Sequence, residues 1–177
     1  MRSTLVILAS TILSAAVPAA FAAEGKVTDP QIAAIVVTAN QVDIDAGNLA
    51  KTRAQSKDVQ AFAKDMVRDH TAVNKSATDL ATKLGVTPEP NATSESLKKG
   101  GDDNMAKLKT LKGAAFDKAY VDHEVVYHQS VIDALDKTLV PDATNAELKA
   151  LLQKSRPAFV EHLEHAKHLQ SQLGTSY

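Results

Sequence analysis

Apolar residues recur every three or four positions along four long stretches of the chain. This is the period of an α-helix that buries one face, and no stretch shows the strict alternation that is typical of a β-strand. The pattern therefore predicts an all-α protein with four long helices, at about residues 29–53, 56–84, 114–139 and 145–173.

Residues that favour helix ends stand where the apolar pattern starts and stops. We predict that the helices are capped by Asp29, Ser56 and the pair Thr144 and Glu147, and are stopped by Gly85 and Pro141. Pro157 lies inside the fourth stretch, where it removes one backbone donor from the helix. It therefore predicts a kink about one turn before His162.

The lengths of the connections indicate how the helices are arranged. The links at residues 54–55 and around Pro141 are short, so each joins two antiparallel helices. The link at residues 86–113 is long enough to run along a helix of about 40 Å. We expect a break at residues 98–101 of this link, followed by a short helix at residues 102–111. Short, long and short connections are typical of a ferritin-like four-helix bundle with a crossover between the second and third helices.

The first 22 residues have the features of a secretory signal peptide. Arg2 provides a positive charge, residues 5–17 are mostly apolar, and residues 20–22 form a small-residue cleavage site. We therefore expect an exported, periplasmic protein, peripheral at most to the outer membrane, in which residues 23–177 form one domain. The chain has no cysteine, which excludes a disulfide framework and a lipid anchor on cysteine.

Charge and hydropathy exclude several classes of partner. Loss of Arg2 with the signal peptide lowers the basic residues from 20 to 19, against 21 acidic residues, and the formal charge from −1 to −2. A chain without a basic stripe is not expected to bind nucleic acid. No later segment has the roughly 18 apolar residues of a membrane span. Other envelope proteins are the partners that we expect.

Four polar residues stand on the apolar faces near the middle of their predicted helices. They are Asp43, His70, His128 and His162, one on each helix. In a bundle of antiparallel pairs, mid-helix positions share one level whichever way the chain runs, so these side chains are predicted to meet in the core. Three imidazoles and one carboxylate suit one divalent transition metal ion, Zn, Cu, Mn or Fe.

Three further residues are candidates for extra ligands or for groups that orient the ligands. Asp69 is adjacent to His70, and Glu124 lies one turn before His128. His165 lies three residues after His162. The spacing of His165 also predicts that it turns toward solvent. The alternative to a metal site is a polar core in which each buried histidine has an ordinary hydrogen-bond partner.

Several phrases of the sequence together support a family resemblance. They are Val42–Ala50, Phe62–His70, Phe116–Tyr120 with the later His128, and His162 before Ala166. In these phrases the chain resembles the exported bacterial family known as domain of unknown function 4142, whose members are often labelled outer-membrane proteins. The resemblance implies a ferritin-like bundle and carries over the set Asp43, His70, His128 and His162, without implying a settled activity.

The sequence departs from di-iron ferritin-like enzymes, which use Glu-x-x-His pairs. The residues three positions before the central histidines are Val67, Val125 and Phe159. This disfavours a carboxylate-bridged two-iron oxidase. Two hypotheses follow: a periplasmic metal-binding bundle in metal handling or envelope stress protection, and a non-catalytic envelope interaction module with a satisfied polar core.

Overall fold

The computed structural model describes residues 25–174, so the predicted signal peptide lies outside the described part of the chain. Residues 25–174 contain helices and no strands, which confirms the all-α prediction. The long helices are α1 (Asp29–Arg53), α2 (Lys57–Leu84), α3 (Ala92–Thr110), α4 (Gly113–Ala134) and α6 (Ala146–Gly174). A π-helical turn, η1 (Leu135–Leu139), and the short α5 (Val140–Asp142) continue α4 toward α6. None of these helices is long and apolar enough to cross a membrane.

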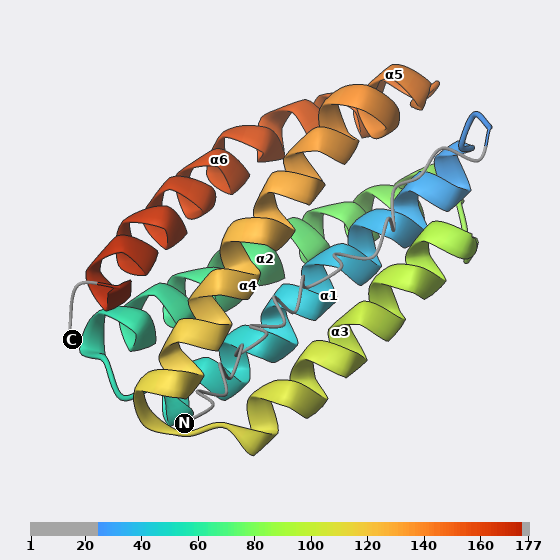
Figure 1. Cartoon of the computed structure of the whole chain (residues 1–177). Helices are drawn as coiled ribbons and strands as arrows, with labels where there is room; N and C mark the ends of the chain where they lie inside the picture. Colours follow the sequence, from blue (N-terminus) through green and yellow to red (C-terminus); the bar gives the residue numbers. More distant parts are fainter. Residues whose placement is uncertain (1–24, 175–177) are drawn as a thin grey trace, which may run out of the picture.

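The helices form two antiparallel hairpins that pack against each other. In Figure 1, α1 lies beside α2, and α4 lies beside α6. Helix α2 also packs against α6, which brings the two hairpins together. The predicted pairing of the first with the second helix, and of the third with the fourth, is therefore confirmed.

Two of the predicted helix ends are confirmed by their hydrogen bonds. The hydroxyl of Ser56 accepts the N–H of Val59 at the start of α2 (3.4 Å). Gly85 ends α2 in the left-handed conformation, with a φ of 64°. Helix α6 runs through Pro157 as one continuous element, and the bend predicted there remains a prediction.

The caps predicted at Asp29 and Thr144 are wrong, and the two errors have one cause. Thr28 caps α1, and the side chain of Asn145 accepts the first free N–H groups of α6. The Asp29 carboxylate instead accepts the N–H groups of Thr144 and Asn145, each at 2.9 Å, and the Thr144 hydroxyl at 2.6 Å. A contact between the two hairpins thus takes the groups that local capping would have used.

The prediction of a break at residues 98–101 and a short helix at residues 102–111 is also wrong. Helix α3 is continuous from Ala92 to Thr110, is capped by Asn91, and packs along α1 (Figure 1). Gly101 is buried in this contact, where an added Cβ would lie 2.6 Å from Cγ2 of Val42. Gly101, which in the sequence suggested a break of the helix, is therefore needed for the close approach of α1 and α3.

Replacement of Gly101 by alanine is expected to destabilise the fold by about 1–3 kcal/mol, because Val42 is β-branched and cannot easily move away. Chemical unfolding of the wild type and the variant measures this. In a Val42→Ala background most of the cost should disappear, since the conflicting methyl groups are gone. An equal cost in both backgrounds would mean that the contact with Val42 is not its source.

Buried apolar side chains form two clusters, one toward each end of the hairpins. One cluster includes Ile32, Ile35, Leu135 and Phe159. The other includes Phe62, Met66, Phe116 and Tyr120. A layer of buried polar residues lies between the clusters along the helices, and its members are Asn40, Asp43, His70, Glu124, His128 and His162.

Candidate metal centre

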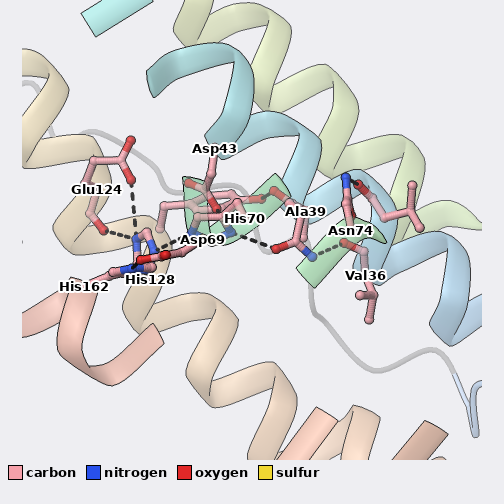
Figure 2. A network of polar contacts seen from close by, with 12 residues as sticks. Val36, Ala39, Asp43, Asp69, His70, Asn74, Glu124, His128 and His162 are labelled. Atoms are coloured by element: carbon pink, nitrogen blue, oxygen red, sulfur yellow. Dashed lines mark hydrogen bonds and ion pairs between the residues drawn. The ribbon is translucent and has the colours of Figure 1, made fainter. Parts of the chain in front are cut away.

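Three of the four predicted ligands meet in this polar layer. Helices α2, α4 and α6 supply His70, His128 and His162, whose side chains converge in Figure 2. Their ring centroids are 5.2–5.5 Å apart, and one nitrogen from each ring lies within 4.8 Å of the other two. All three residues are buried, with 1–7% exposure. We call these residues the three-histidine group.

The hydrogen bonds around His70 determine which of its nitrogens carries the proton. Its Nδ1 lies 2.7 Å from Oδ1 of Asn40, whose amide nitrogen donates to the carbonyl of Val36 (2.8 Å). Because the Asn40 nitrogen is engaged in this way, its Oδ1 accepts, and Nδ1 of neutral His70 is the donor. The other nitrogen, Nε2, is left with a free lone pair.

His128 is oriented in the same way by its own helix. Its Nδ1 lies 3.0 Å from the backbone carbonyl of Glu124, which can only accept a hydrogen bond. Nδ1 therefore carries the proton. The bare Nε2 of His128 lies 3.4 Å from the bare Nε2 of His70.

His162 is oriented by a charged pair that reaches the surface. Its Nε2 lies 3.0 Å from Oδ2 of Asp69, and Arg68 holds both oxygens of this carboxylate at 2.7 and 2.9 Å. The Arg68 guanidinium holds the pKa of Asp69 below its usual value, so the ionised carboxylate accepts a hydrogen bond from Nε2–H of His162. Nδ1 of His162 is consequently the bare nitrogen, and it is buried without a hydrogen-bond partner.

Each of the three rings thus has one nitrogen with a free lone pair, and the free nitrogens of His70 and His128 face each other. Burial lowers the pKa of His70 and of His162, and neighbouring histidines lower it further, so the neutral form is favoured. Neutral imidazole nitrogen is a metal ligand. Two nitrogens bound at 2.0–2.1 Å to a tetrahedral ion would lie about 3.3 Å apart, close to the 3.4 Å between His70 and His128.

Asp43 lies near the three-histidine group but faces a different nitrogen. Its Oδ2 is 3.5 Å from Nδ1 of His70, on the protonated side of the ring. It forms a second group with Glu124 and His128, whose potential ligand atoms lie within 4.8 Å of one another. Burial and the neighbouring Glu124 carboxyl raise the pKa of Asp43 well above its usual value. The structure therefore does not bring Asp43 into one group with all three histidines.

The three additional candidates have different positions. Asp69 contacts His162, and Glu124 is fully buried one turn before His128. His165 is exposed, and its ring packs edge-on against Phe62 at 5.0 Å. The structure therefore places Asp69 and Glu124 at the polar layer and His165 outside it.

Asn40 contributes to the site, although the sequence analysis did not identify it. It lies one turn after Val36 and three residues before Asp43, so it falls on the apolar face of its helix. The polar side chain of Asn40 on that apolar face is the feature of the sequence that could have indicated its role in the site. Its amide fixes the tautomer of His70, a role that depends on a contact between two helices.

The polar layer is not fully hydrogen-bonded within the described residues. Buried side-chain atoms there without a hydrogen-bond partner are Asp43 Oδ1, both carboxylate oxygens of Glu124 and His162 Nδ1. The buried hydroxyl of Tyr120, one turn before Glu124, also has no such partner. Buried polar groups ordinarily have such partners, because their desolvation is costly. The side chains of the described residues therefore do not by themselves pair every polar atom of this layer.

Comparison with known proteins gives a family and no characterised relative. The model of one family, described as domain of unknown function (DUF4142), matches residues 14–169. No curated protein and no solved structure matches the chain.

Proposed function

We propose that this chain, which belongs to the DUF4142 family, binds one divalent transition metal ion through His70, His128 and His162. The observation that supports this most is that each of the three buried rings donates one N–H to a fixed acceptor and keeps one bare nitrogen. One nitrogen from each ring lies within 4.8 Å of the other two. Metal-binding histidines are ordinarily held in this way by an amide, a backbone carbonyl or a carboxylate.

The composition of the group narrows the choice among Zn, Cu, Mn and Fe. Its ligand atoms are all imidazole nitrogens, and no carboxylate oxygen belongs to it. Imidazole suits Zn, Cu and Fe, whereas carboxylate oxygens suit Mn, and Fe(II) binds a given site more weakly than Cu(II) or Zn does. We therefore propose Zn or Cu as the ion of this group. Three protein ligands would leave a fourth position for water or a small substrate.

We also propose the wider setting in which this ion would act. The helical hairpins fit a ferritin-like bundle whose crossover contains the helix α3. Together with the predicted signal peptide, the site supports a periplasmic protein that handles metal or protects the envelope under stress.

Metal titration of the metal-free protein tests the proposal. A ligand that binds only the folded state stabilises it by about 2.7 kcal/mol at a hundred times its Kd. We expect Zn or Cu(II) to raise the melting temperature accordingly, with smaller effects of Mn and Fe(II). Identical melts with and without each of the four metals would reject the proposed function.

The pH dependence of metal stabilisation provides a second prediction. The lowered pKa of His70 and His162 means that the folded protein resists their protonation. Stability from these residues is therefore present above the ordinary imidazole pKa of about 6.5 and is lost as pH falls below it. The metal increment should persist at pH 6.5 and fade at lower pH, as protons compete with the ion. Melts with and without Zn between pH 8 and pH 4.5 measure this, and an increment already lost at pH 7.5 would contradict it.

A further inference from the structure

We propose that Asp43, Glu124 and Tyr120 form a second cation site, beside the three-histidine group, for a divalent ion that prefers oxygen ligands. This inference goes beyond the function proposed above and does not require an ion at the three histidines.

The two groups lie at different nitrogens of the same ring. Nε2 of His128 faces His70 at 3.4 Å, whereas Nδ1 of His128 lies 3.4 Å from Oε2 of Glu124. Asp43 joins Glu124 on this second side, since its potential ligand atom lies within 4.8 Å of theirs. The carboxyl groups therefore define a place of their own and do not complete the three-histidine group.

Oxygen atoms on this side lack partners. Asp43 Oδ1 and both carboxylate oxygens of Glu124 are buried without a hydrogen bond in the described part of the protein. Asp43 is 2% exposed and Glu124 is 0% exposed. Three oxygens of the two carboxyl groups are thus buried without a donor from another residue. In the absence of a cation, the pairing open to these carboxyl groups is a proton shared between them.

Tyr120 is an independent sign of a ligand. It lies one turn before Glu124 on α4, is fully buried, and its hydroxyl has no hydrogen-bond partner. Tyr120 and Glu124 are four positions apart, so both lie on the same face of α4. Burial raises the pKa of Tyr120, and the charges of Glu124 and Asp43 raise it further. A neutral phenol oxygen can complete a set of oxygen ligands there.

The charge of the pair determines what it can hold. Asp43 and Glu124 have only histidines within ion-pair distance among residues 25–174, and neither is paired with a lysine or an arginine. Two carboxylates this close cannot both be ionised in a buried place without a cation. A divalent ion neutralises both, and carboxylate oxygens suit Mn, Mg and Ca. We use Mn²⁺ as the probe.

The test is a two-metal titration of the full-length protein. The metal-free protein is first given one equivalent of Zn²⁺ and is then titrated with Mn²⁺, with free Mn²⁺ followed by electron paramagnetic resonance. We expect one Mn²⁺ to bind per chain. In crystals soaked with Mn²⁺, an anomalous peak should lie within ligand distance of Asp43 and Glu124. An ordered water at that place, without an anomalous peak, would overturn the inference.

Variants separate the two sites. The pair of changes Asp43→Asn and Glu124→Gln keeps the shapes of the side chains and should abolish Mn²⁺ binding while Zn²⁺ still binds. Tyr120→Phe should weaken Mn²⁺ several-fold. His162→Ala should weaken Zn²⁺ and leave Mn²⁺ in place.

The outcomes also separate the inference from the proposed function. Binding of Mn²⁺ without any Zn²⁺ would reject the three-histidine proposal and retain the second site. A single ion per chain, whose affinity falls in the Asp43→Asn and Glu124→Gln variant, would mean that the carboxyls only balance the charge of the histidine-bound ion. That result would overturn the inference, and crystals of the wild type decide the matter if the double variant does not fold.

Discussion

Replacement of His70 by alanine is expected to lower the affinity for Zn or Cu by at least about 100-fold, because it removes one of three ligand nitrogens. Loss even of groups that only orient a ligand costs 10–100-fold. The variant should therefore show no metal-dependent rise in melting temperature at concentrations that stabilise the wild type by about 2.7 kcal/mol. Its metal-free form should also be less stable by roughly 1–3 kcal/mol, since Asn40 loses its buried partner.

Replacement of His165 by alanine is the matched control for this experiment. His165 is exposed and lies outside the three-histidine group, although it stands only three residues after His162. The His165→Ala variant should retain the full metal increment. Loss of the increment in this variant, with retention in His70→Ala, would place the metal on the protein surface.

Replacement of Asp43 by asparagine is expected to stabilise the metal-free protein at pH 8, by roughly 1–3 kcal/mol. The raised pKa of Asp43 means that the folded state prefers the protonated carboxyl. Stability from this preference is lost as pH rises from about 3.9, the unfolded value, through the folded pKa. Asparagine cannot ionise, so the variant avoids that loss, and its advantage should be largest at high pH and small near pH 4.

Melts in the presence of a chelator, at pH 8 and at pH 4.5, measure this difference. Asp45→Asn is the control, because Asp45 is exposed on the same helix, and it should change stability by less than 0.5 kcal/mol at either pH. A destabilised Asp43→Asn protein at both pH values would mean that ionised Asp43 makes a favourable contact in the fold.

The apolar period was sufficient to predict four of the five long helices, α1, α2, α4 and α6, because burial of one face determines where a helix runs. It also predicted the level of the site, since counting from each helix start placed His70, His128 and His162 in the middle of their helices. The structure brings these three together. Distance along a helix follows directly from the number of residues.

The features that were predicted wrongly or missed depend on contacts between segments far apart in the sequence. Gly101 suggests a helix break in the sequence, but in the structure it makes room for Val42 of the neighbouring helix. Thr144 has the sequence features of an N-cap, but in the structure its N–H and its hydroxyl donate hydrogen bonds to Asp29. Asp43 faces Nδ1 of His70 and not Nε2 because of how α1 and α2 are rotated about their axes. Residue spacing in the sequence does not determine this rotation accurately enough to tell the two nitrogens apart.

The division of the site between the two hairpins has a consequence for folding kinetics. His70 belongs to the hairpin of α1 and α2, and its two partners belong to the hairpin of α4 and α6. Each hairpin joins neighbours in the sequence, whereas His70 and His128 are 58 residues apart. An ion could therefore bind all three rings only after the hairpins have docked. Such an ion would act as a removable cross-link, which slows unfolding and leaves the rate of folding nearly unchanged.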